Sequence, residues 1–212
     1  MKLKFPAWLA ATFGVVIAAV SIPAAVAQTA ADDEAILLVA NPRLREPAYV
    51  HSVVLVAPID NNRHVGVIVN RPTRRSLSSL FPEHQPSKQV TDPVYFGGPM
   101  SPRALFALVR SETDPGGGSM PFLKNVFLAR TMDTIDRIIE KTPNEARYFV
   151  GNVIWRPGEL RAELDRGLWH AMNPHAETIF RKQTDGLWEE LLRAARAVTA
   201  HAGHAGPALV LR

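Results

Sequence analysis

The chain has 212 residues, of which 47% are hydrophobic and 21% are charged, and its formal net charge at neutral pH is +4. This length suits one domain with a sizeable hydrophobic core. The absence of cysteine excludes disulfides and a lipid attached to an N-terminal cysteine, and the small net charge provides little long-range attraction to nucleic acid.

The first 27 residues have the three parts of a secretory signal peptide. Lys2 and Lys4 form a basic start, residues 7–20 are almost wholly apolar, and Ala25-Val26-Ala27 offers small residues for a signal peptidase. The apolar stretch is shorter than the ~20 residues of a membrane-spanning helix, although an uncleaved anchor is the alternative. We therefore expect cleavage after Ala27, and a periplasmic or secreted protein with no stable membrane span.

The rest of the chain predicts a single α+β domain over residues 35–198, after a linker at residues 28–34. Strands and helices are mixed without a βαβ rhythm, which favours α+β over a doubly wound sheet. In the first half, β-rich runs predict strands, and Ser76 is placed to cap a short helical turn at residues 76–81. The predicted strands there are residues 35–40, 51–57, 64–69, 94–96 and 104–110.

The second half begins with residues 114–119, DPGGGS, which predict an exposed loop or hairpin tip. Apolar periodicity then predicts both strands and helices, and residues 199–212 are expected to form a flexible tail. The predicted strands are residues 126–129, 147–150 and 176–180, and the predicted helices are residues 131–141, 157–165 and 186–198.

Residues 151–169 form the most distinctive motif, GNVIWRPGELRAELDRGLW, with two tryptophans fourteen positions apart. Pro157 and Gly158 predict a strand that stops and a helix that starts. Trp155 and Trp169 would stack on a carbohydrate if both were exposed, but their apolar neighbours favour packing. Glu159 and Glu163 share one helical face, and nearby arginines favour a surface ion-pair network over a catalytic carboxylate pair.

Several residues at the ends of predicted elements are candidates for ligand binding. Gly97 and Gly98 offer backbone amides to an anion, or fit a tight strand exit. Arg71 belongs to a basic group that would suit an acidic ligand such as a uronate polymer, or forms a solvated loop. The candidates are Asn41, Asn70, Arg71, Gly97, Gly98 and Trp155.

No catalytic residue, cofactor or metal site is predicted. The seven histidines lack zinc-site spacing, no GxSxG nucleophile elbow is present, and no GxGxxG or GKS phosphate motif accompanies the glycine pair. Helix-turn-helix and interleaved aromatic-basic patterns are also absent from the sequence, so nucleic acid is an unfavoured partner.

Four blocks in order resemble the YqgE/AlgH family, and the resemblance extends from about residue 35 to residue 194. The blocks are residues 37–42, 65–72, 94–100 and 151–169. The resemblance implies a compact α+β domain whose mixed strands form a flattened, barrel-like arrangement with flanking helices. The family's biochemical activity is not established, and its name comes from proposed regulation of alginate synthesis genes.

This chain departs from the family pattern at several positions. Pro58 and Ile59 stand where the family commonly has an acid and a histidine, Val109 replaces a usual histidine, and Glu159 replaces a usual glutamine. The signal peptide is a further departure, since most members look cytoplasmic. These differences disfavour catalysis through those histidines, and they disfavour direct control of transcription.

The favoured function is therefore a non-enzymatic binding or regulatory domain, whose partner is a protein or a small acidic ligand. One alternative is an enzyme with a site near the Gly97-Gly98-Pro99 turn. The other is a transcriptional regulator that contacts DNA. The sequence does not specify an oligomeric state.

Overall fold

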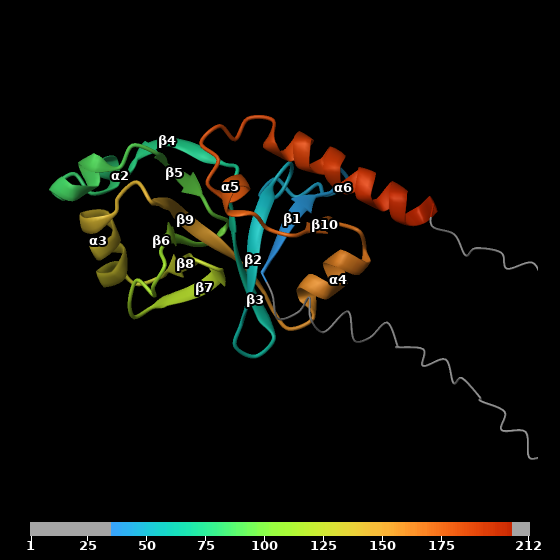
Figure 1. The fold of residues 1–212 in the computed structure, drawn as a ribbon, viewed down its shortest axis with the longest axis horizontal. Coiled ribbons are helices and arrows are strands. Elements are labelled where there is room, and N and C mark those ends of the chain that lie inside the picture. The colour runs from blue at the N-terminus through green and yellow to red at the C-terminus, as the bar shows by residue number, and fades with distance from the viewer. Residues whose placement is uncertain (1–34, 205–212) are drawn as a thin grey trace, which may run out of the picture.

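The computed structural model describes residues 35–204, in which a curled sheet is flanked by helices (Figure 1). The predicted signal peptide, residues 1–27, and linker, residues 28–34, lie outside the described residues, as does the end of the predicted tail, residues 205–212. Among helices within residues 35–204, none combines the length and the apolar character needed to cross a membrane.

The described residues form ten strands, five α-helices and one 3₁₀ turn. The strands are β1 (Ile36–Ala40), β2 (Val53–Ile59), β3 (Arg63–Ile68), β4 (Pro72–Ser76), β5 (Pro93–Phe96), β6 (Met100–Arg110), β7 (Ser119–Leu123), β8 (Val126–Ala129), β9 (Ala146–Trp155) and β10 (Trp169–Met172). The helices are α2 (Leu77–Leu80), α3 (Met132–Lys141), α4 (Glu159–Asp165), α5 (Ala176–Ile179) and α6 (Leu187–His204), and the 3₁₀ turn is η1 (Gln85–Gln89).

The strands form one mixed sheet that curls into a half-barrel. Its main path runs β10-β1-β2-β3-β9-β6-β8-β7 with antiparallel neighbours, while β5 pairs in parallel with β9 and carries β4 at its other side. Strands β10 and β7 therefore end the main path, and each pairs with one neighbour. The α+β class is confirmed, and the barrel-like arrangement is an open half-barrel.

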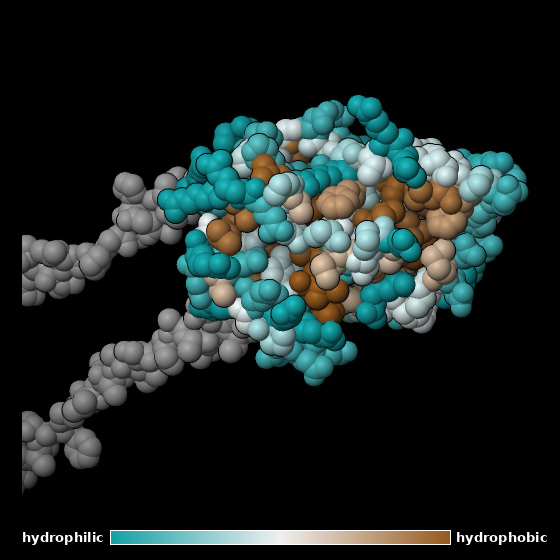
Figure 2. Space-filling model, turned by 180° about the vertical axis from the view of Figure 1, so that it is seen from behind, coloured by the Kyte–Doolittle hydropathy of each residue, from teal (hydrophilic) through white to brown (hydrophobic). Residues whose placement is uncertain are grey.

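Two hydrophobic cores cover the two faces of the sheet, and strand alternation divides the residues between them. In β6, Phe106 and Leu108 join the large core, whereas Leu105, Ala107 and Val109 join the small core with the isoleucines of α3. The large core lies beneath α6 and contains the buried apolar residues of β1, β2 and β3. Figure 2 views the molecule from behind and shows apolar residues gathered in the middle of that face within a polar rim.

The prediction of a strand at residues 176–180 is wrong, because Ala176–Ile179 form the short helix α5. The carbonyl of His175 accepts hydrogen bonds from the N–H groups of Thr178 and Ile179, which closes one helical turn. That turn buries Ile179 completely. A five-residue run with three apolar residues fits one helical turn as well as a strand, so its tertiary contacts decide the outcome.

Three strands, β4, β7 and β10, have no counterpart among the predicted elements. They are short, with four or five residues each, and they lie at borders of the sheet where one-sided pairing tolerates polar residues. The predicted cap at Ser76 is confirmed, since its Oγ accepts from the N–H of Ser79 at 3.2 Å. Helix α6 continues to His204, past the predicted domain end at residue 198.

Arg147 of β9 is the largest fully buried side chain, with 1% of its surface exposed. Its Nη1 donates to the carbonyl oxygens of Val69 at 3.3 Å and Ile179 at 2.6 Å, and its Nη2 donates to that of Arg181 at 2.7 Å. The guanidinium also lies 4.3 Å from the ring centroid of Tyr95. Burial lowers the pKa of Arg147. The side chain thus fastens the segment around α5 to the centre of the sheet.

We expect Arg147→Met to lower the free energy of unfolding by about 3 kcal/mol, because it leaves buried carbonyl oxygens without donors. Urea unfolding measures the change. The matched control is Arg130→Met, at an exposed arginine, which should change stability by less than about 0.5 kcal/mol. A methionine variant as stable as the wild type would show that these hydrogen bonds do not hold α5 in place.

Candidate functional site

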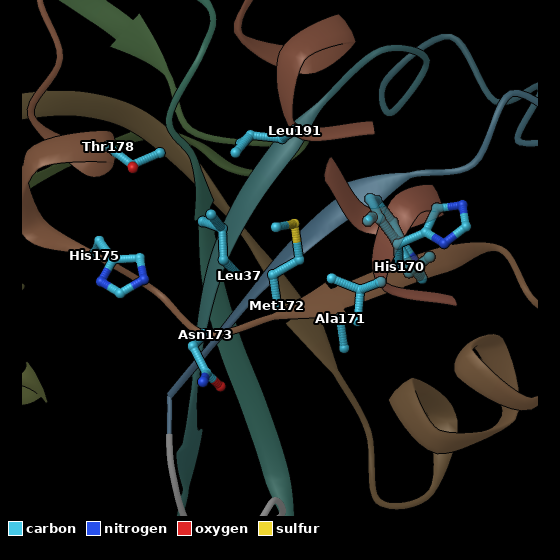
Figure 3. Close-up of a pocket in the computed structure, with 11 residues that line it drawn as sticks. Leu37, His170, Ala171, Met172, Asn173, His175, Thr178 and Leu191 are labelled. Atoms are coloured by element: carbon cyan, nitrogen blue, oxygen red, sulfur yellow. The ribbon is translucent and has the colours of Figure 1, made fainter. Parts of the chain in front are cut away.

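A groove with a volume of about 580 Å³ lies between β10, α5 and α6 (Figure 3). Five consecutive residues, from Trp169 to Asn173, contribute to its lining, so the groove follows the border of the sheet. The other lining residues are Leu37, His175, Thr178, Leu191, Ala195 and Val198.

Strand β10 presents a free backbone edge to this groove. The N–H of Asn41 donates to the carbonyl of Leu168, and the register pairs Leu38 with Ala171. In an antiparallel pair, hydrogen-bonded and non-hydrogen-bonded residue pairs alternate, so the N–H and C=O of Ala171 point away from β1. Ala171 is exposed, and within residues 35–204 these two backbone groups have no hydrogen-bond partner.

The walls of the groove are mainly apolar. Leu37 and Met172 come from the sheet, while Leu191, Ala195 and Val198 follow one another at helical spacing along α6. Val198 is 69% exposed and lies at the far end of this wall. Helix α6 is held at its other end by Trp188, whose Nε1 donates to the carbonyl of Ala40 at 2.8 Å and whose ring lies 4.0 Å from that of His51.

The charge of the groove is neutral or weakly positive. None of its lining residues is acidic, and its titratable side chains are His170 and His175. Burial, followed by the charge of Arg196, lowers the pKa of His170, so this imidazole is neutral at neutral pH. Its Nε2 lies 3.2 Å from Nδ2 of Asn41. Within residues 35–204, no group of three or more His, Cys, Asp or Glu is placed to hold a metal ion.

Behind the groove, a single carboxylate oxygen joins the two tryptophans of the sequence motif. Glu163 Oε2 accepts from Nε1 of Trp155 at 2.9 Å and from Nε1 of Trp169 at 2.7 Å. The tryptophans are 3% and 5% exposed, and their rings meet edge to face at 6.4 Å. Their interpretation as packing residues is confirmed, and α4 is thereby fixed to both β9 and β10.

Within residues 35–204, neither Glu159 nor Glu163 forms an ion pair with an arginine side chain. Glu159 Oε2 accepts from the N–H of Arg156 at 2.8 Å, Arg161 pairs with Asp165 at 3.0 Å, and Arg166 donates to a main-chain carbonyl. The two glutamates therefore act separately: Glu159 stabilises the start of α4, and Glu163 binds indoles. The predicted surface ion-pair network around them is wrong.

Asn70 and Arg71 fasten the loop between β1 and β2. Asn70 accepts from the N–H of Val53 at 2.9 Å and donates to the carbonyl of His51 at 2.9 Å. Arg71 donates to the carbonyls of Ala48 at 2.6 Å and Val50 at 2.5 Å. Their polar groups are thus already occupied by main-chain partners.

Gly97 and Gly98 lie where β5 passes very close to β9. A Cβ atom at Gly97 would collide with the carbonyl oxygen of Gly151, and one at Gly98 with that of Asn152. The N–H of Gly97 donates to the carbonyl of Val150 at 2.8 Å. Glycine is needed at both positions because the two backbones approach too closely for a side chain. This agrees with the interpretation of the pair as a tight strand exit.

The structure divides the six predicted site residues between two places. Asn70 and Arg71 lie beside the Gly97-Gly98 turn, where the N–H of Phe96 donates to the carbonyl of Arg71 at 2.9 Å. Asn41 and Trp155 adjoin the groove, through His170 and through the shared carboxylate respectively. The sequence predictions did not identify the residues that line the groove as a site, and interpreted only Trp169 among them as a packing residue. The extension of the apolar face of α6 to Val198 was the signal that could have indicated an unfilled surface.

We expect Glu163→Ala to lower the free energy of unfolding by about 2 kcal/mol, because two buried indole N–H groups lose their acceptor. The near-ultraviolet circular dichroism of the tryptophans should change with it. Glu159→Ala, on the same helix, should cost less than about 1 kcal/mol, since its partner is an exposed backbone N–H. Equal effects of the two substitutions would contradict a special role for Glu163.

The chain is similar to known proteins over most of its length. A UPF0301 protein of Methylococcus capsulatus is 28% identical over 171 residues, which are 78% of this chain and 92% of that protein. A UPF0301 protein of Thermobifida fusca is 30% identical over 174 residues, which are 74% of this chain and 84% of that protein.

Two solved structures share the fold. The solution structure of the AlgH protein from Pseudomonas aeruginosa has a TM-score of 0.61 at 22% identity and covers 82% of this chain and 94% of its own. The crystal structure of a Corynebacterium diphtheriae protein has a TM-score of 0.63 at 18% identity and covers 75% of this chain and 85% of its own. Residues 37–199 match the family described as AlgH-like, and the chain belongs to that family.

Proposed function

We propose that the domain is a binding module that takes up a short extended segment of another polypeptide along β10. The observation that carries the proposal is the outward-facing backbone of Ala171, which borders an apolar groove beneath α6. An exposed strand edge can accept a further strand through main-chain hydrogen bonds, while pockets beside it select side chains.

The groove supplies both kinds of contact. An added segment would hydrogen-bond to the N–H and C=O of Ala171, and its alternate side chains would face Met172, Leu191 and Val198. The neighbouring structure is fixed before binding, since Glu163 holds Trp169 and Trp188 holds α6. A rigid site of this kind loses little conformational entropy on binding.

The same contacts favour binding over catalysis. The two histidines of the groove have no carboxylate beside them among its lining residues, so the arrangement lacks the orienting partner of an acid–base pair. The alternative site at Gly97 and Gly98 is filled by the backbone of β9. A role in DNA binding has no support in the small net charge.

A display library of random dodecapeptides, selected on the folded domain, tests the proposal. We expect selected peptides to alternate apolar residues and to bind at least tenfold more weakly to Ala171→Pro, because proline removes the outward N–H from an edge position that tolerates it. Fluorescence anisotropy measures the dissociation constants, and urea unfolding verifies that the variant is folded.

The helical wall of the groove provides a second variant and its control. Val198→Asp places a charge on the apolar wall and should also weaken binding. Met132→Asp changes another exposed apolar residue, at the start of α3, and should leave binding unchanged. The absence of any enriched peptide, or equal binding by the Ala171→Pro variant, would refute strand addition.

We also propose that the domain works outside the cytoplasm. The support is the order of basic start, apolar run and small residues within residues 1–27. Residues 1–35 fused to an alkaline phosphatase without its own signal should give active, exported enzyme. Val16→Arg with Ile17→Arg breaks the apolar run and should abolish export. An inactive cytoplasmic fusion of the unchanged segment would contradict the proposal.

A further inference from the structure

A second groove, with a volume of about 790 Å³, adjoins the first one. Asn173 lines both grooves, and Pro174 follows it into the second. The opposite wall is formed by the end of β2 and by the hairpin of β7 and β8. Its residues are Ala57, Pro58, Pro121, Phe122, Leu123, Lys124, Asn125 and Phe127, and Ala35 completes the lining.

The two grooves adjoin each other at Asn173, which lines both of them. Residues Trp169 to Asn173 line the first groove, and the second groove lies beyond the C-terminal end of β10. An extended chain advances about 3.3 Å per residue, so about four residues cover β10, and the residues that follow can enter the second groove. A single extended segment longer than β10 therefore suits both grooves.

The charges along the two grooves have one sign. Among residues 35–204, no aspartate or glutamate lines either groove, and Lys124 is the only lysine or arginine that does. Lys124 is exposed, and it makes no ion pair within residues 35–204. On its other side it borders a third groove with Glu112, Glu177 and Arg110, and neither glutamate pairs with it.

We infer that the segment bound along β10 continues past Asn173 and places an acidic side chain against Lys124. The inference rests on the proposed function and adds the chemistry of the partner: an extended peptide, apolar along β10 and acidic at the end that lies beyond Asn173. Lys124 then determines specificity, because an opposite charge is attracted at this position and a like charge is repelled.

Parallel selections of the dodecapeptide library on the unchanged domain, on Lys124→Glu and on Lys141→Glu test the inference. Lys141 is an exposed lysine at the end of α3, so its reversal alters the net charge equally. We expect aspartate and glutamate at one end of the peptides selected by the unchanged domain and by Lys141→Glu. Lys124→Glu should instead select lysine and arginine at that end.

Affinities of one selected peptide give the size of the effect. Lys124→Glu should lower the affinity for the acidic peptide by about tenfold, because one exposed attraction between charges is lost and one repulsion is gained. When lysine replaces the acidic residue of this peptide, the Lys124→Glu variant should bind it with most of the lost affinity restored. High salt should reduce both changes, since exposed charges are screened.

The outcomes separate this inference from the proposed function. Peptides that bind along β10 with no acidic end, or an acidic end that Lys124→Glu leaves unchanged, would overturn the inference while strand addition stands. A selection that yields no peptide dependent on Ala171 would overturn the proposed function, and the inference with it.

Discussion

The buried guanidinium of Arg147 is the interaction on which the rest of this structure depends. A charged side chain at the centre of a sheet is costly unless its donors are used, and here they hold the carbonyls of Val69, Ile179 and Arg181. Ile179 is the last residue of α5, and Arg181 lies two residues after it. The chain that leaves β10 is thereby tied to the middle of the sheet before it returns as α6.

This path creates the groove. Because α5 is fastened at the centre of the sheet and α6 is anchored near Ala40 by Trp188, the far half of α6 overhangs β10. Glu163 fixes the beginning of β10 through Trp169. The open edge at Ala171 is therefore bordered by rigid elements on each side. Most proteins cover or shorten such an edge, and β10 is short but remains accessible.

The sequence indicated the parts of the fold whose patterns are local. Strands β1, β2, β3 and β9 and helices α3 and α6 follow from apolar periodicity, and the motif at residues 151–169 indicated the family. Asn70 and Arg71 were predicted as ligand residues, but their side chains bind the main chain of the loop between β1 and β2. Contacts with a loop about twenty residues away along the chain leave no local pattern in the sequence, so this role could not be predicted. The groove escaped prediction for a related reason, since it joins Leu37, residues 169–178 and α6, which are brought together only by the tertiary fold.

The central claim is that β10 accepts another strand through the backbone of Ala171. Amide hydrogen exchange at this residue, measured by NMR with and without a saturating selected peptide, tests it most directly. The account predicts fast exchange in the free domain and strong protection in the complex, with little change at Leu38, which already lies inside the sheet. Peptide binding that leaves the Ala171 amide unprotected would contradict the account.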